Sequence, residues 1–171
     1  LTGLSGTITL AGASVIEINV SLAIQGPGST GLTVSGANAS RVFQSTASLP
    51  AILRISDLTI ANGRAAGFGG CINAQGELRL TNSVVTGCTA VHDAIAYPSY
   101  LSGVGGGVAA YVLLTQSSTI SGNTTPAAST NWRMSTTGRT LVARSGEPAT
   151  AEMNRARAIE ARPATATTTM S

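Results

Sequence analysis

The stretch Leu78-Arg79-Leu80-Thr81-Asn82-Ser83-Val84-Val85-Thr86-Gly87 decides the fold, because its second half recurs along this 171-residue chain. The related phrases are Leu32-Thr33-Val34-Ser35-Gly36, Leu58-Thr59-Ile60-Ala61-Asn62-Gly63 and Ser118-Thr119-Ile120-Ser121-Gly122-Asn123-Thr124. Their central apolar residues, Val34, Ile60, Val85 and Ile120, are 26, 25 and 35 residues apart. A β-rich unit repeating about every 25 residues is typical of a solenoid in which each turn stacks on the last. We therefore expect these four residues to form one internal column.

Apolar residues alternate with polar ones around these phrases, which predicts short strands with one buried face. The alternating pairs are Ile8 and Leu10, Ile16 and Ile18, Leu22 and Ile24, Leu53 and Ile55, and Leu78 and Leu80. Glycine and proline interrupt them at turns, as in Gly26-Pro27-Gly28. Three short strands per turn around one core make a parallel β-helix. The sequence therefore predicts an all-β solenoid over residues 1–125.

The composition changes after residue 125. Residues 1–125 carry as many arginines as acids, whereas 126–171 hold the whole net charge of +3 and are rich in Thr, Ala and Arg. We expect 126–171 to be a flexible tail, mostly disordered, with one weak helix over 151–162. The arginines form no stripe interleaved with aromatic residues, so nucleic-acid binding is not expected. No apolar run approaches the 18 or more residues of a membrane helix, so no membrane span is expected.

Three short polar residues fall at equivalent places, directly before the repeated phrase. They are Asp57, Asn82 and Ser117. A side chain of this kind can bond backbone groups that are left free at a corner. Stacked on successive turns, the three would form a structural ladder. A carboxylate site is the weaker interpretation, because only Asp57 is acidic.

The 35-residue spacing contains ten extra residues, which lie within 90–102. This excursion holds the only histidine, His92, together with Asp93, Tyr97 and Tyr100. Insertions in a solenoid emerge as loops on one face and often carry binding. The excursion is the strongest candidate for a contact surface of the coil, and these four residues are the candidate binding residues, although a loop without binding is the favoured interpretation. That interpretation is a solvated loop whose tyrosines pack back on the coil.

Cys71 and Cys88 are the only cysteines. They could pair in an oxidising compartment. However, they are 17 residues apart on different strands of one turn, so their Cα atoms could be too distant for a bridge. We therefore favour two small buried thiols over a disulfide. Two cysteines without CxxC spacing and one histidine do not make a zinc site, so no metal or cofactor is expected.

Several phrases together resemble a known family, the right-handed parallel β-helix proteins of bacterial surfaces, close to the polymorphic outer-membrane-protein type. The matching phrases are Gly69-Gly70-Cys71-Ile72, Gly106-Gly107-Val108, Leu80-Thr81-Asn82-Ser83 and Ser121-Gly122-Asn123. The resemblance covers about residues 3 to 125. It implies a right-handed coil, a secreted or outer-membrane location, and carbohydrate or a host or matrix protein as partner. Residues 126–171 match neither further turns nor an anchor of that family.

Three functions remain open at this stage. The first is a non-enzymatic surface or secreted protein, adhesin-like or structural, and the second is a polysaccharide lyase or hydrolase or its inactive remnant. The second needs paired carboxylates on one face, yet the coil holds only Glu17, Asp57, Glu77 and Asp93. The third is a truncated gene product without independent function. We expect no catalytic residues; His92 and Asp93 would be the only acid/base candidates.

Overall fold

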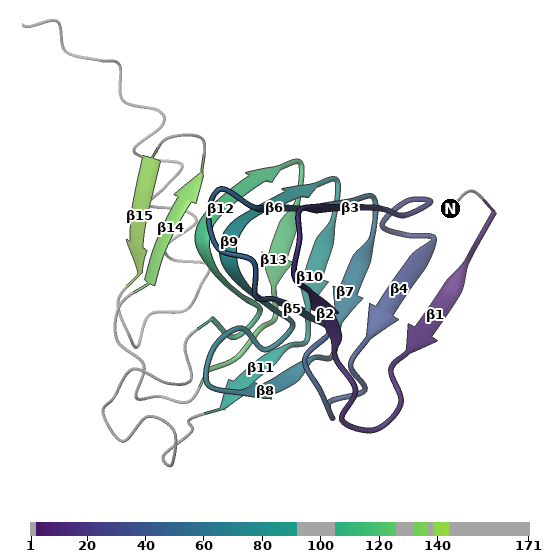
Figure 1. The fold of residues 1–171 in the computed structure, drawn as a ribbon. Helices are drawn as coiled ribbons and strands as arrows, with labels where there is room; N and C mark the ends of the chain where they lie inside the picture. The colour runs from purple at the N-terminus through teal and green to yellow at the C-terminus, as the bar shows by residue number, and fades with distance from the viewer. Residues whose placement is uncertain (1–2, 92–104, 126–131, 137–138, 144–171) are drawn as a thin grey trace, which may run out of the picture.

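The computed structural model describes residues 3–91, 105–125, 132–136 and 139–143. They form strands throughout: β1 Gly6–Thr9, β2 Ile16–Ile18, β3 Leu22–Gln25, β4 Leu32–Ser35, β5 Phe43–Ser45, β6 Ile52–Ser56, β7 Thr59–Ala61, β8 Arg64–Ala66, β9 Ile72–Thr81, β10 Val84–Thr86, β11 Thr89–Val91, β12 Val108–Gln116, β13 Thr119–Ser121, β14 Trp132–Thr136 and β15 Arg139–Ala143. Through β13 they make a parallel β-solenoid of about three turns (Figure 1), as the repeats predict.

The repeated phrases form one parallel sheet, in the order β1-β4-β7-β10-β13. Its register joins Ile8 to Val34, Val34 to Ile60, Ile60 to Val85 and Val85 to Ile120. The predicted internal column is therefore confirmed, and Ile8 extends it by one turn. The 35-residue step keeps this register, since Val85 pairs with Ile120 as Ile60 pairs with Val85, although ten more residues separate the first pair.

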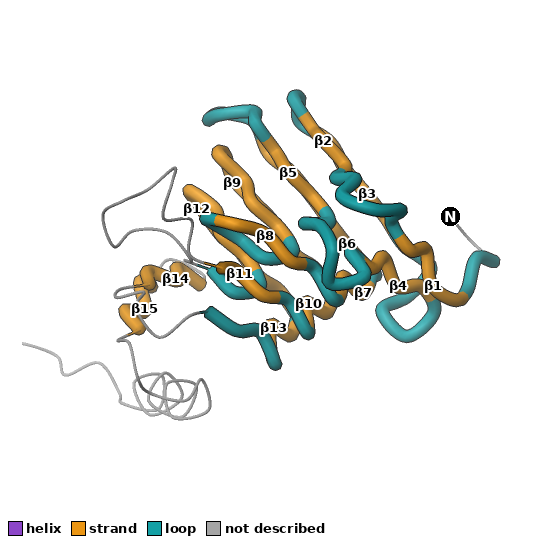
Figure 2. The backbone as a smooth tube through the Cα atoms, turned by 90° about the horizontal axis from the view of Figure 1, so that it is seen from below, coloured by secondary structure: helices purple, strands orange, loops and turns teal. Residues whose placement is uncertain are grey.

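The second sheet contains the longest strands. β9 pairs with β5 along its first half and with β6 along its second half, and β12 pairs with β9 along its whole length. β2 and β3 lie at the outer edges of this sheet, beyond β5 and β6. Figure 2 shows β2, β5, β9 and β12 side by side in succession. We call this the long-strand sheet; β8 and β11 make a smaller parallel pair beside it.

Inward side chains from all turns form one apolar core. Six of its fully buried side chains come from the alternating positions and the column predicted above: Leu53, Ile55, Ile60, Leu78, Leu80 and Val85. Val42, Leu58 and Ile72 are also fully buried. In parallel strands, equivalent residues of neighbouring turns lie about 4.8 Å apart, so each side chain packs on its own equivalent. The stacked columns explain how a chain with few aromatic residues buries a continuous core.

Backbone hydrogen bonds continue through the corner between the long-strand sheet and the repeated phrases. The amides of Gly26, Asp57 and Asn82 each donate to a carbonyl of the following turn, at 2.9, 3.0 and 3.0 Å. Asp57, Asn82 and Ser117 all adopt positive φ, near 50°. Short polar residues tolerate this left-handed conformation better than most, which is why they occupy this corner.

The tail differs in part from the expectation of disorder or weak helix. Within it the structure describes an antiparallel hairpin, β14–β15, in which Trp132 is opposite Ala143. β14 lies next to β12. Alternation of polar and apolar residues over 132–136 is the local pattern that favours a strand. The proposed helix over 151–162 lies outside the described residues, and the division of the chain at residue 125 stays a prediction.

Candidate functional site

Charged side chains of the coil gather on the outer surface of the long-strand sheet. Arg54 on β6 and Arg79 on β9 alternate with buried leucine and isoleucine, so both point outward. Glu77 lies on the same surface of β9, two residues before Arg79. Glu17 on β2 also alternates with inward isoleucines and is exposed. We call this outer surface of β5, β6, β9 and β12 the polar face.

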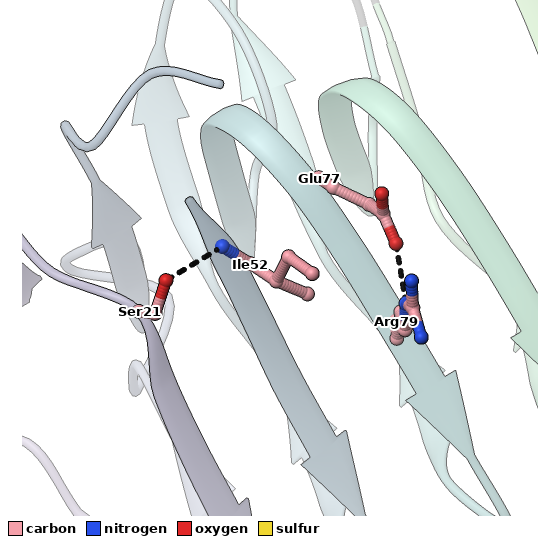
Figure 3. A network of polar contacts seen from close by, with 4 residues as sticks. All are labelled: Ser21, Ile52, Glu77 and Arg79. Carbon is pink, nitrogen blue, oxygen red and sulfur yellow. Dashed lines mark hydrogen bonds and ion pairs between the residues drawn. The ribbon is translucent and has the colours of Figure 1, made fainter. Parts of the chain in front are cut away.

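Two arginines are neighbours on this face. Arg54 is the register partner of Arg79 in the parallel ladder of β6 and β9. Figure 3 shows Glu77 turned along β9 toward Arg79, with which it forms an ion pair. The side chain of Arg54 forms no hydrogen bond or ion pair with any part of the chain that the structure describes. The cluster therefore has one positive charge in excess and one free guanidinium.

An exposed aromatic ring lies beside this cluster. Tyr111 on β12 is 74% exposed. The ladder between β9 and β12 shifts register here, since Ala110 is opposite Ala74 and Val112 is opposite Glu77. Two residues of β9, Gln75 and Gly76, therefore face the single Tyr111, and the bulge lies on β9 directly across from it. Bulges commonly re-aim a side chain. The sequence analysis missed Tyr111 because it concentrated on the tyrosines of the excursion. The available signal was a tyrosine among the apolar residues of a strand.

Arg41 has a structural role at the edge of this face. Its guanidinium donates to the carbonyl oxygens of Gly69 at 2.9 Å and Phe68 at 2.6 Å, and it also bonds the side chain of Gln44. Burial lowers the pKa of Arg41, since desolvation disfavours the charged form. The carbonyls offset part of that cost and hold the connection between β8 and β9 in place.

The corner ladder is only partly joined by its side chains. The Asn82 side-chain amide donates to the Asp57 carboxylate at 3.3 Å. Ser117 continues the ladder through its positive φ, which it shares with Asp57 and Asn82. The backbone N–H of Asn82 donates to the carbonyl oxygen of Gln116, the residue before Ser117, at 3.0 Å. These contacts are local and agree with a structural role. His92, Asp93, Tyr97 and Tyr100, the predicted binding residues, lie outside the described residues.

The cysteines differ from the preferred expectation of two thiols. Cys71 and Cys88 form a disulfide with their Cα atoms 5.5 Å apart, and both are fully buried. The expected distance was wrong because the turn folds back at this place: Gly63, beside Cys71, and Cys88 occupy equivalent corner positions of successive turns. Gly63 permits this approach, since a Cβ there would lie 2.6 Å from the Cys71 sulfur.

The described acidic residues lie at three separate places. Glu17 is in register with Gln44, Glu77 with Ile52, and Asp57 lies in the corner beside Asn82. Over the described part of the chain, no three His, Cys, Asp or Glu side chains form a group suited to a metal ion. Within the same residues, no helix has the length and apolar character to cross a membrane. On the polar face, as far as the structure describes the chain, Glu77 is the single carboxylate.

Comparisons with family models, with curated proteins and with solved structures gave no significant match to this chain. The parallel β-solenoid itself is what the structure establishes about its class.

Proposed function

We propose that this chain is a non-enzymatic, secreted or cell-surface solenoid, adhesin-like, of the kind that the bacterial surface β-helix resemblance suggests. Its polar face would bind an acidic carbohydrate or an acidic segment of a host or matrix protein. The observation that carries this proposal is the unpaired Arg54 beside Arg79 and the exposed Tyr111 on one sheet surface.

The chemistry of the face supports an anionic, extended partner. Stacked turns create long regular surfaces, which suit chain-like ligands. Arginine binds carboxylate groups through two parallel hydrogen bonds, and an uncommitted guanidinium keeps all its donors available. Tyrosine adds rigid apolar area with a polar tip. The Cys71–Cys88 disulfide supports an oxidising location such as the periplasm or the outside of the cell.

A binding comparison tests the face. Polygalacturonate, heparin, neutral dextran and collagen would be immobilised and probed with the wild type, an Arg54→Ser/Tyr111→Ser variant and an Arg64→Ser control. Arg64 is an exposed arginine on β8, outside the long-strand sheet, so the control loses the same charge elsewhere. We expect an acidic surface to retain the wild type and Arg64→Ser. The double variant should bind at least about tenfold more weakly, since loss of one anchor residue typically exceeds 1 kcal/mol.

Two outcomes would contradict the proposal. Equal binding by the wild type and the double variant would remove the polar face as the site, and a Tyr97→Ala/Tyr100→Ala variant would then test the excursion. Release of unsaturated or reducing sugars from polygalacturonate, lost in Asp93→Asn, would replace the non-enzymatic proposal with the lyase or hydrolase alternative.

A further inference from the structure

A second polar cluster lies near the start of β9, at the end of the strand away from the two arginines. Gln44 on β5 is the register partner of Asn73 on β9, and both are half-buried on the polar face. Glu17 on β2, beside the polar face, is the register partner of Gln44. Figure 2 shows β2, β5 and β9 in succession. Neighbouring strands are about 4.8 Å apart, so the three residues form a row across the strands, which we call the amide row.

Arg41 fixes how the two amides of this row are turned. Its guanidinium has only donors, so the Gln44 atom that accepts from it must be the side-chain oxygen, Oε1. The Asn73 side chain contacts the same oxygen at 3.4 Å and must therefore do so with its nitrogen, Nδ2. The other amide atoms, Gln44 Nε2 and Asn73 Oδ1, form no hydrogen bond to any residue that the structure describes. They are available to an external partner.

The amide row therefore presents a donor between two acceptors. Gln44 Nε2 carries two N–H groups, Asn73 Oδ1 accepts on one side, and the Glu17 carboxylate accepts on the other. A hydroxyl group both donates and accepts, so two neighbouring hydroxyls of one sugar ring can satisfy such a row. A carboxylate can only accept, and the charge of Glu17 would repel it. Hydroxyl groups thus suit the amide row better than anions do.

Tyr111 lies between the amide row and the arginines along the direction of the strands. On β12, Ala109 is opposite Asn73 and Val112 is opposite Glu77, and Tyr111 lies between these two residues of β12. Its exposed ring offers rigid apolar area, which suits the C–H face of a sugar ring. Arg79 is six residues after Asn73, which is at most about 20 Å in a strand. An occupant that reaches both ends must therefore be several sugar units long.

We propose that the amide row is a subsite for sugar hydroxyls, and that the occupant of the polar face is an acidic polysaccharide. This inference rests on the proposed function, because the arginines bind carboxylates of the same polysaccharide chain. One sugar ring lies on Tyr111 between them. Neighbouring hydroxyls of a further ring donate to Asn73 Oδ1 and accept from Gln44 Nε2. The amide row thereby distinguishes a polysaccharide from an acidic protein segment.

Calorimetric titration with two acidic probes tests the subsite. Long oligogalacturonates present carboxylates and hydroxyls, whereas polyglutamate of similar length presents carboxylates without hydroxyls. Asn73→Val removes the acceptor, and valine suits a strand. We expect this variant to bind oligogalacturonate about tenfold more weakly than the wild type, through the loss of a hydrogen bond. It should bind polyglutamate as the wild type does, and that result also shows that the variant is folded.

Thr119→Val is the matched control, because it removes one polar side chain from an exposed strand position on another sheet. It should bind both probes like the wild type, whereas Arg54→Ser/Tyr111→Ser should bind both more weakly. A wild type that binds neither probe would contradict the proposed function and this inference with it. If the wild type binds both, an Asn73→Val variant that is unchanged, or weakened equally for both, would overturn the hydroxyl subsite alone.

Discussion

Ile60 is the residue on which the repeat depends most. It is fully buried between Val34 and Val85, its partners in the previous and next turns. A carboxylate at this place would lie in an apolar column without a partner.

We expect Ile60→Asp to lower the free energy of unfolding by about 4 kcal/mol or more, a large part of the stability of a domain this size. Urea denaturation followed by circular dichroism measures this loss. Thr119→Asp is the control, because Thr119 is exposed on the same sheet and should keep the wild-type midpoint. If Ile60→Asp unfolds at the wild-type midpoint, the column does not support the fold.

Cys71, directly before β9, and Cys88, between β10 and β11, form the only disulfide of the described chain. A bridge that closes a loop of this length contributes about 3 kcal/mol, mainly by restricting the unfolded chain. We expect a Cys71→Ala/Cys88→Ala variant to lose about this much stability. A reducing agent should then destabilise the wild type but leave the variant unchanged. Equal urea midpoints for the wild type with and without reductant, after full equilibration, would show that the bridge contributes nothing.

At the scale of the element, Asp57, Asn82 and Ser117 form the corner between the long-strand sheet and the repeated phrases. They connect β6 to β7, β9 to β10 and β12 to β13, respectively. Asn82 has φ of 48°, a conformation that β-branched residues rarely adopt. Its side-chain bond to Asp57 is exposed and is therefore worth little.

We expect Asn82→Val to cost about 1–2 kcal/mol through backbone strain, whereas Asn82→Gly should stay close to the wild type. Asn73→Val is the matched control, because Asn73 lies within β9 and valine favours strands. Thermal unfolding of the three variants checks the order. Equal losses in Asn82→Val and Asn82→Gly would mean that the side chain, rather than the backbone conformation, supports the corner.

At the scale of the whole molecule, every member of the apolar core that the structure describes lies within residues 3–125. We therefore expect a chain that ends at Thr125 to keep cooperative unfolding and a similar thermal midpoint, since removal of 126–171 breaks no column. Calorimetry of the shortened and full chains measures this. Loss of cooperativity would show that residues beyond 125, among them the β14–β15 hairpin next to β12, are needed to cover the last turn.

The sequence by itself determined the repeat, the alternation of inward and outward residues and the polar corner. These depend on local rules: a strand exposes every second residue, and repeats of 26 and 25 residues place Val34, Ile60 and Val85 in register. The strand pair in the tail was missed, since the composition of 126–171 outweighed its short alternating segment.

The tertiary structure alone decided the disulfide and the polar face. Cys71 approaches Cys88 because the coil brings successive corners together, and Gly63 leaves room for the sulfur. Arg54 meets Arg79 because β6 and β9 pair in register, and Tyr111 lies across β9 from them, next to the residue that pairs with Glu77. Each of these results depends on contacts between successive turns. Those contacts are set by the lengths of the loops and by the coiling of the chain, which no local sequence pattern contains.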